Sequence, residues 1–494
     1  MAPRSKLTTQ MRLFSRSFSE RNSVSTFHCA QSASFDGSTS SAFNNITFCV
    51  KTFGCQMNKH DSERVCGMLE SLGAQWVEEI EDADLVVFMT CCVREAADTR
   101  LYGQVASMKN IPLRPGTPHS KRIVAVGGCI GQRDGQKLLD ALPHLDVVFG
   151  THNLGSLPKL LAKSLEEGSR NVEILESSEQ FPTELPTDRE HEWAAWLPIT
   201  IGCNNFCTYC IVPYVRGREK SRPLEDIVAE AQRYADAGVK EITLLGQNVN
   251  SYGRDLYGHP RFVDVLDAID ATGIKRLRFA TSHPKDLTDE VIRRFGTLRS
   301  LMPALHLPVQ SGSNRILEAM NRRYTREHYK ELVAKLREAC PEIALSTDVI
   351  VGFPGETEGD FQDTYDLIDE IGFHQVFTFI YSKREGTPAA KIDDPTPHEV
   401  IQNRFDRLVD VVQKHAWERN QVDLGKTVEV LVEGTSKRDA RLLAGRSPKN
   451  QTVHALIPAG LDAKSIQGKF LNVSIDEAKT WYLSGSVIEG SLHD

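Results

Sequence analysis

The most specific chemical signal in this chain of 494 residues is a run of three cysteines. Cys203, Cys207 and Cys210 have the spacing Cys-x3-Cys-x2-Cys. Three thiolates at this spacing can bind three irons of a cube-shaped [4Fe-4S] cluster and leave the fourth iron without a protein ligand. Such an iron can chelate the amino and carboxylate groups of S-adenosylmethionine, and one electron then cleaves it to a 5′-deoxyadenosyl radical. We therefore expect radical chemistry, with these three as the catalytic cysteines.

Zinc is the alternative occupant of the triplet. Structural zinc usually takes four ligands in paired Cys-x2-Cys arrangements, and the triplet has no second pair beside it. The spacing therefore favours an iron-sulfur cluster.

Three further cysteines, Cys55, Cys91 and Cys129, each follow a predicted strand in the N-terminal part of the chain (47–53, 84–90 and 123–127). In an open parallel sheet the carboxyl ends of neighbouring strands form the crevice where ligands bind, so these thiols can converge although they are far apart in sequence. We predict that they hold a second [4Fe-4S] cluster, whose open iron could accept an external sulfur species.

Cys92 complicates this second set because it is adjacent to Cys91, and either thiol could reach the cluster. Strand alternation points neighbouring side chains to opposite sides, so we expect only one of the two to be a ligand. Cys49, Cys66 and Cys340 are interpreted as buried cysteines that behave as small hydrophobic residues.

The N-terminal part of the chain, which contains Cys55, Cys91 and Cys129, alternates β-branched apolar runs with amphipathic helical stretches. Strands are expected at 47–53, 84–90, 123–127 and 146–150, with a helix that begins near Asn58 and is stopped by Gly73. Residues 46–160 are therefore predicted to form a doubly wound α/β domain. Residues 161–195 lack sustained periodicity and are interpreted as a linker.

A second α/β series follows over residues 196–422. Six strand candidates lie at 197–201, 241–245, 276–281, 304–309, 345–351 and 376–381, which predicts a partial (βα)6 barrel. A long helix from 398 to 420 closes the series. Residues 423–494 contain short strands and turn residues, which indicates a small β-barrel.

Polar residues at the strand ends of the central barrel are candidates for binding S-adenosylmethionine. Gln247 and Asn248 follow the second strand, Ser311 follows the fourth, and Asp348 lies in the fifth strand before a glycine-rich turn. The carboxyl ends of barrel strands form the reactive mouth. Each of these residues could also belong to an ordinary turn.

Composition restricts the possible partners. The chain is 40% hydrophobic and 25% charged, and it contains no apolar run of the length that spans a membrane, so no membrane partner is expected. Its net charge of −8 argues against indiscriminate nucleic-acid binding but allows a local basic face. Two basic regions are candidates for phosphate binding, although each could be a solvated surface: Arg216, Arg218, Lys220 and Arg222, and residues 436–469.

Residues 1–45 are rich in serine and contain more basic than acidic residues. This composition suits a mitochondrial transit peptide, with a disordered tail as the alternative, and plastid or cytoplasmic location as the other possibilities.

Several segments together resemble the methylthiotransferase family of radical S-adenosylmethionine enzymes. The segments around Cys55, Cys91 and Cys129 carry the resemblance together with the triplet, and coverage runs from about Ile46 to the C-terminus. Within the family, the sequence is most similar to the MiaB type because of residues 211–223, 244–250, 281–284 and 305–313. Two departures are Met89, where the family commonly has Asn, and Cys92, where it often has a small polar residue.

The resemblance implies that one cluster generates the radical and the auxiliary cluster delivers sulfur to carbon 2 of an N6-modified adenosine beside the tRNA anticodon. It implies two [4Fe-4S] clusters, S-adenosylmethionine, an electron donor, a sulfur donor, and an RNA-binding TRAM-like domain at the C-terminus. The alternatives are another acceptor, either threonylcarbamoyl-adenosine tRNA or a ribosomal protein, or a regulatory protein that retains its clusters for interaction.

Overall fold

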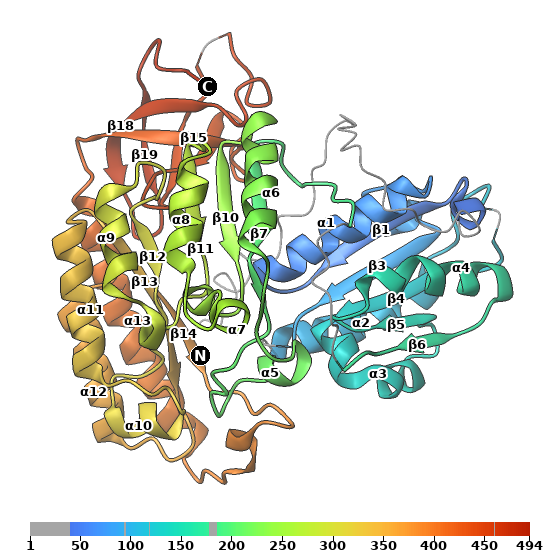
Figure 1. The fold of residues 1–494 in the computed structure, drawn as a ribbon, viewed down its shortest axis with the longest axis horizontal. Coiled ribbons are helices and arrows are strands. Elements are labelled where there is room, and N and C mark those ends of the chain that lie inside the picture. Colours follow the sequence, from blue (N-terminus) through green and yellow to red (C-terminus); the bar gives the residue numbers. More distant parts are fainter. Residues whose placement is uncertain (1–39, 93–94, 118, 177–184, 459) are drawn as a thin grey trace, which may run out of the picture. The chain divides into compact units, whose positions relative to one another are not determined.

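The computed structural model describes residues 40–92, 95–117, 119–176, 185–458 and 460–494 (Figure 1). Most of the predicted transit peptide therefore lies outside the described residues. Its last residues do not form a tail, because Phe43 is fully buried in a hydrophobic core. The chain forms two compact units: the described residues up to Glu190 with Ile211–Arg218, and His191–Cys210 with Glu219–Asp494.

The N-terminal unit contains a sheet of six parallel strands in the order β2-β1-β3-β4-β5-β6. The strands are β1 (Thr47–Thr52), β2 (Gln75–Trp76), β3 (Leu85–Thr90), β4 (Ile123–Gly128), β5 (Val147–Phe149) and β6 (Asn171–Glu173). Its helices are α1 (Gln56–Ser71), α2 (Glu95–Ser107), α3 (Cys129–Ala141), α4 (Leu157–Glu167) and the short α5 (Val212–Val215). The predicted doubly wound α/β fold is confirmed.

Both faces of this sheet are covered, as the hydrophobic strands predict. Val87 packs into one core, with α1 and α4, and its neighbour Val86 packs into the other, with α2 and α3. A parallel sheet covered on both faces has buried strands without polar alternation, which is the pattern of β3, where all six residues are buried.

The predicted linker over residues 161–195 is wrong in its first part. Lys163 lies inside α4, and β6 adds a sixth strand to the sheet. Farther on, the backbone N–H groups of Asp188 and Glu190 donate to the backbone carbonyl and the carboxylate of Glu63, both at 3.0 Å. The end of the segment is therefore tied to α1.

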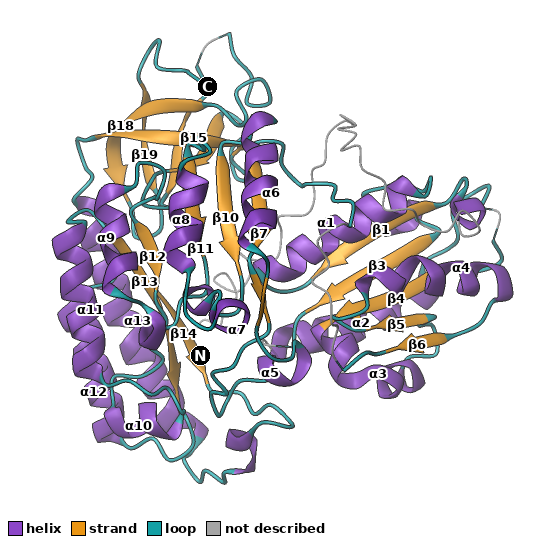
Figure 2. Cartoon of the chain, viewed as in Figure 1, coloured by secondary structure: helices purple, strands orange, loops and turns teal. Residues whose placement is uncertain are grey.

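The second unit contains six parallel strands in two sheets, β11-β10-β7 and β12-β13-β14, joined by the parallel bridge between Leu277 and Leu301 (Figure 2). The strands are β7 (Ala194–Pro198), β10 (Glu241–Leu245), β11 (Arg276–Phe279), β12 (Ala304–His306), β13 (Ala344–Val351) and β14 (Gln375–Ile380). The helices are α6 (Leu224–Asp236), α7 (Arg254–Tyr257), α8 (Phe262–Asp270), α9 (Asp289–Thr297), α10 (Asn314–Ala319), α11 (Arg326–Ala339), α12 (Glu358–Ile371) and α13 (His398–Gln421). This arrangement confirms the predicted partial barrel.

The first barrel strand starts three residues earlier than expected. Residues after Pro198 leave the barrel sheet, because β8 (Thr200–Ile201) pairs antiparallel with β9 (Lys220–Ser221). The cysteine triplet lies between β8 and β9. Its loop is therefore held at its base by a two-stranded ladder.

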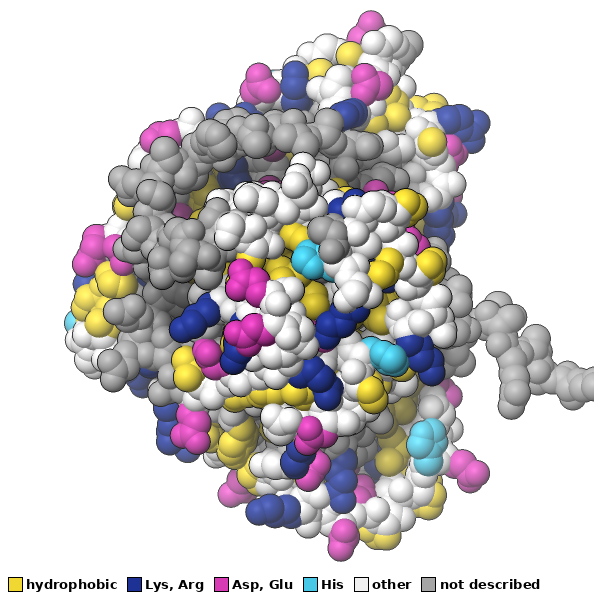
Figure 3. Space-filling view, turned by 90° about the vertical axis from the view of Figure 1, so that its right-hand side faces the viewer, with side chains coloured by type: hydrophobic (Ala, Val, Ile, Leu, Met, Phe, Trp, Pro, Cys, Tyr) yellow, Lys and Arg dark blue, Asp and Glu magenta, His cyan; other side chains and the backbone are white. Residues whose placement is uncertain are grey.

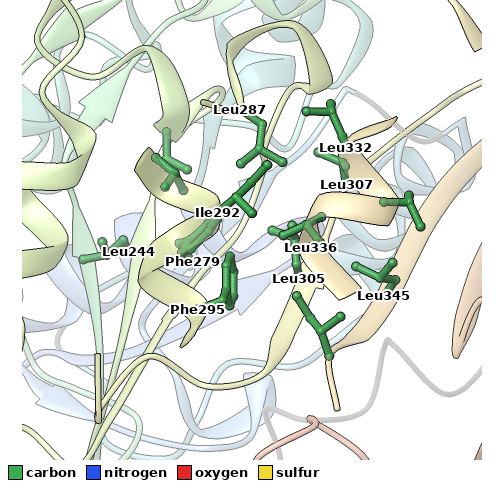
Figure 4. Close-up of a cluster of buried hydrophobic side chains, with 14 of the residues drawn as sticks. Leu244, Phe279, Leu287, Ile292, Phe295, Leu305, Leu307, Leu332, Leu336 and Leu345 are labelled. Carbon is green, nitrogen blue, oxygen red and sulfur yellow. The ribbon is translucent and has the colours of Figure 1, made fainter. Parts of the chain in front are cut away.

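Large apolar side chains fill the space between the barrel strands and the surrounding helices (Figure 4). Leu244, Phe279 and Leu345 come from three different strands, and Phe295 and Leu336 come from helices α9 and α11. Burying a side chain of this size stabilises the fold by about 1.5–3 kcal/mol. This core fixes the strand ends on which the site residues lie.

The C-terminal residues form a closed barrel in the order β15-β16-β17-β19-β18, which confirms the predicted small β-barrel. Its strands are β15 (Thr427–Thr435), β16 (Leu442–Arg446), β17 (Thr452–Leu456), β18 (Phe470–Ala478) and β19 (Leu483–Val487). Arg278 of β11 donates to the carbonyls of Ser447 and Pro448, both at 2.9 Å. Within the described residues, no helix has the length and apolar character needed to cross a membrane.

Candidate metal centres

The triplet loop combines two backbone positions with positive φ. Gly202 has φ 78° and Phe206 has φ 48°, so the chain turns sharply before Cys203 and again before Cys207. Positive φ is costly for a bulky residue such as Phe206, and it persists only where the surroundings enforce it. Cys203 and Cys207 are buried, and Cys210 is half-buried.

The turn after α10 supplies that enforcement. The Asn321 side-chain amide donates to the backbone carbonyls of Asn205 (3.2 Å) and Phe206 (3.0 Å). The Thr208 N–H donates to the Met320 carbonyl at 3.1 Å. These bonds hold the backbone carbonyls between Cys203 and Cys207. The backbone of the loop is therefore fixed in one conformation.

The triplet thiols need positive charge beside them before they can ionise. Burial raises the pKa of the Cys203 thiol to about 11, and the Cys207 thiol lies nearby. Arg322 approaches the Cys207 sulfur, with 3.4 Å between Nη1 and Sγ. Three thiols on one loop could ionise together if metal ions offset their charge, which is the requirement for binding an iron-sulfur cluster.

The strand ends of the N-terminal unit bring the second set of cysteines together. Cys55 caps α1 after β1, Cys91 directly follows β3, and Cys129 is the first residue of α3 after β4. The three strands are neighbours, with Thr52 beside Met89 and Thr90 beside Gly128. A hydrogen bond joins the thiols of Cys55 and Cys91.

The second set is electrostatically different from the triplet. A hydrogen bond from Cys91 and the charge of Arg216 lower the pKa of Cys55 to about 6, against the opposing effect of desolvation by neighbouring atoms, although the residue is exposed. A hydrogen bond from Cys92 and the same arginine lower the pKa of Cys129 to about 7. Cys55 and Cys129 also lie at helix N-termini, which favour negative charge.

Cys92 does not point away from this set, contrary to the expectation from strand alternation. Its thiol donates to Cys129, and this bond together with burial raises the pKa of Cys92. Strand β3 ends at Thr90, so alternation no longer governs the two residues that follow it. Cys91 therefore contacts Cys55, and Cys92 contacts Cys129. Among the described residues, no three Cys, His, Asp or Glu side chains have the closed geometry of a bound metal ion.

The four residues predicted to bind S-adenosylmethionine have different surroundings. The Gln247 side chain accepts from the Gly202 N–H and so supports the triplet loop. Ser311 is fully buried and bonds with Thr364 and the Ser313 N–H, beside the start of α10. These two side chains have structural partners.

Asn248 and Asp348 are more available to a ligand than Gln247 and Ser311. The Asn248 amide donates to Asp286 at 2.7 Å, but its buried Oδ1 has no hydrogen-bond partner among the described residues. Asp348 lies on β13, half-buried, with 3.5 Å between its Oδ2 and Nε2 of His306.

Three further polar residues, which follow β10 and β11, were not among the residues predicted to bind S-adenosylmethionine. Asn250, Ser282 and His283 are buried, and each has a side-chain polar atom without a partner among the described residues. The Nδ1 atom of His283 accepts from the Lys285 N–H at 3.2 Å, so its unpartnered Nε2 carries the proton. Burying such atoms is costly unless a ligand or water satisfies them. The segment 281–284 had been noted only as part of the family resemblance.

The expected basic patch beside the triplet is wrong for two of its four residues, whereas Arg218 is exposed and Lys220 is half-buried. Arg216 is buried and pairs with Asp61 at 2.9 Å, and Arg222 is buried and pairs with Glu230 at 2.7 Å. Sequence spacing could not reveal these acidic partners, which come from other elements. On the face drawn in Figure 3, the described acidic and basic side chains are interspersed.

The basic tail is also partly neutralised. Arg441 pairs with Asp439 at 2.7 Å, and Lys449 contacts Asp423 at 2.9 Å. Lys437 and Arg438 are exposed at the turn between β15 and β16.

Three family models match successive parts of the chain. Residues 47–150 match the uncharacterized protein family UPF0004, residues 197–368 match the radical SAM superfamily, and residues 421–488 match the TRAM domain. The solved radical S-adenosylmethionine methyltransferase TsrM from Kitasatospora setae is similar in fold, with TM-score 0.50, 14% identity, and coverage of 70% of this chain and 77% of that one. The fold and the triplet therefore define a radical S-adenosylmethionine enzyme, whose family uses a [4Fe-4S] cluster and S-adenosylmethionine.

Curated relatives define the family more closely. A protein from Caldicellulosiruptor saccharolyticus named tRNA-2-methylthio-N(6)-dimethylallyladenosine synthase is 47% identical over 447 residues, or 90% of this chain and 93% of the relative. A protein of the same name from Carboxydothermus hydrogenoformans is 45% identical over 445 residues, or 90% and 99%. The chain belongs to this methylthiotransferase family.

The prediction of a mitochondrial location is wrong. The relatives named above are enzymes of bacteria, whose cells contain no mitochondria. The basic, serine-rich composition of the first residues was not specific enough to identify a targeting signal.

Proposed function

We propose that this enzyme inserts sulfur and a methyl group at carbon 2 of an N6-modified adenosine next to the anticodon of a tRNA. The similarity to synthases of this name over 90% of the chain is the observation that carries the proposal. The two separate cysteine sets support it, because radical generation and sulfur delivery are different tasks. The TRAM domain is consistent with an RNA substrate.

Cys203, Cys207 and Cys210 are proposed as the ligands of the radical-generating cluster. When bound, that cluster supplies one electron to S-adenosylmethionine at an iron that has no protein ligand. The chain's own task is to hold the loop rigid through Gln247 and Asn321 and to keep water away from the thiols of Cys203 and Cys207, which are buried.

Cys55, Cys91 and Cys129 are proposed as the ligands of an auxiliary [4Fe-4S] cluster. The fit rests on their common sheet edge and on the lowered pKa of Cys55 and Cys129, because thiolates rather than thiols ligate iron. An external sulfur donor would load this site, and a separate electron donor would serve the radical cluster.

The S-adenosylmethionine pocket is proposed to use Asn248 and Asp348 directly. Asn250 and His283 join them because their buried polar atoms need a ligand. Gln247 and Ser311 contribute by shaping the loops that surround the ligand. His283 can donate from Nε2, since burial lowers its pKa and keeps the ring neutral.

The proposed division of labour is an auxiliary-cluster domain over 46–160, a radical domain over 196–422 and an RNA-binding domain over 423–494. In the last domain, Lys437 and Arg438 are proposed to contact the phosphate backbone, while the target base enters the radical domain.

A competition assay tests the acceptor. The reconstituted enzyme receives S-adenosylmethionine, a reductant, sulfide, unmethylthiolated tRNA and the ribosomal protein acceptor together, and both products are measured by mass spectrometry. We expect methylthio-adenosine with an N6 substituent and unmodified protein. A methylthiolated aspartate with unchanged tRNA would overturn the assignment, and tRNA modified only at threonylcarbamoyl-adenosine would redirect it.

A further inference from the structure

The chain segment directly after the triplet is part of the N-terminal unit. Ile211 and Val215 are buried in the core that also contains Cys92 and Cys129. The Thr151 hydroxyl donates to the Val215 carbonyl at 2.7 Å. The next side chain, Arg216, is therefore held at a fixed place beside the auxiliary cysteines.

Arg216 makes three directed contacts in that place. Its Nε donates to the Cys129 sulfur at 3.3 Å, and its Nη2 donates to Asn58 Oδ1 at 2.7 Å and Asp61 Oδ2 at 2.9 Å. The residue is 6% exposed. Asn58 in turn donates to the Phe53 carbonyl at 3.3 Å, in the turn that leads to Cys55. The guanidinium thus links the surroundings of Cys129 and Cys55.

We propose that Arg216 is a positioning residue for the auxiliary site, which fixes Cys129 and stabilises the reduced form of the group that the cysteines hold. The inference rests on the proposed auxiliary cluster. It assigns control of the cluster's reduction potential to a residue that is far in sequence from the proposed ligands.

The physical reason is the combination of charge and direction. A buried cation is costly and needs anionic partners, and Asp61 alone would be sufficient for an ordinary ion pair. Arg216 instead directs a second N–H group at a ligand sulfur. A donor and a positive charge at that sulfur favour the form of the cluster that carries more negative charge, so they raise its reduction potential. Lysine cannot reproduce the planar fork.

The experiment uses the full chain with Cys203, Cys207 and Cys210 replaced by alanine, so that only the auxiliary cluster remains. In this parent we compare Arg216→Gln, Arg216→Lys and the control Arg122→Gln. Arg122 is also a buried arginine of the N-terminal unit, but it donates to backbone carbonyls, including those of Ala83 and Pro112. Iron content and an anaerobic redox titration followed by electron paramagnetic resonance are the readouts.

For Arg216→Gln we expect a shift of the reduction equilibrium toward the oxidised cluster by about tenfold, which equals about 59 mV for one electron. Arg216→Lys should recover part of the shift, and Arg122→Gln should lower thermal stability without changing the potential. Loss of iron in both Arg216 variants, with iron retained in Arg122→Gln, would also support the positioning role.

Full iron and an unchanged potential in Arg216→Gln would overturn the role of Arg216. An equal shift in Arg122→Gln would overturn it as well, since any destabilised N-terminal unit would then give the same result. A parent chain without iron would instead overturn the auxiliary-cluster assignment itself.

Discussion

The two cysteine sets of this enzyme are built in opposite ways. The triplet lies on one loop, in eight consecutive residues, and two positive-φ positions shape it. The auxiliary set is assembled from three strand ends by the order of a parallel sheet. A loop site is therefore defined by local spacing, whereas a sheet-edge site is defined by topology.

The sets also differ in how they reach the thiolate state. Burial raises the pKa of Cys203 to about 11, so this thiol is neutral at pH 7 unless a positive charge lies beside it. Neighbouring thiols and Arg216 lower the pKa of Cys55 and Cys129 to about 6 and about 7. Two thiols at the sheet edge therefore ionise more readily than the thiol of Cys203.

Removing the triplet should have the largest effect. Replacing Cys203, Cys207 and Cys210 with alanine should reduce the iron of the reconstituted chain from about eight atoms to about four and abolish cleavage of S-adenosylmethionine. Iron analysis and detection of 5′-deoxyadenosine measure the two effects. Replacing Cys340, which lies outside both sets, is the control and should change neither quantity. Cleavage by the triple variant would contradict the assignment of the triplet.

Substitution of a single glycine, Gly54, should impair the auxiliary cysteine set and leave the triplet intact. In Gly54→Ala the new Cβ would lie 2.3 Å from Cys91 Cβ, at a position with φ 142°. We expect a cost of about 1–3 kcal/mol and loss of auxiliary iron, with cleavage of S-adenosylmethionine retained. Gly103→Ala, where nothing lies within 4 Å, is the matched control and should be neutral or stabilising. Normal auxiliary iron in Gly54→Ala would show that Cys91 is not confined as described.

Cys91 and Cys92 should respond unequally. Cys91→Ala is expected to lose auxiliary iron and product, because Cys91 directly follows β3 and contacts Cys55. Cys92→Ala should keep its iron and lose activity only in part, because Cys92 donates to Cys129. Iron content and product formation of the single variants distinguish the two. Equal losses would mean that both thiols are required.

The C-terminal barrel should give the smallest effects. Neutralising the exposed Lys437 and Arg438 together should weaken tRNA binding and reduce the slope of log affinity against log salt by about 1–2. Neutralising Arg441 should change less, because Asp439 already offsets its charge. Binding titrations at several salt concentrations measure this. An equal effect of Arg441 would show that its ion pair opens on binding.

The elements of this fold were largely predictable, because their signals are local. Strand β10 and the start of α13 were predicted to the residue, and the triplet was found from its spacing. The convergence of the auxiliary thiols could be inferred because parallel sheets align their carboxyl ends.

Features that depend on residues far apart in the sequence could not be predicted from local patterns. Arg216 and Arg222 were expected on a basic surface, but Asp61 and Glu230 neutralise them in the interior. Likewise, nothing in the spacing around His283 indicates that its Nε2 is buried without a partner. Such pairings are set by tertiary packing, for which a single sequence contains no periodic signal.

The division of labour between the cysteine sets is tested most directly by the chain with Cys55, Cys91 and Cys129 replaced by alanine. The measurement is simultaneous quantification of 5′-deoxyadenosine and methylthio-adenosine after incubation with unmethylthiolated tRNA. The account predicts that 5′-deoxyadenosine continues to form while methylthio-adenosine disappears. Methylthio-adenosine at the level of the unaltered enzyme would contradict it.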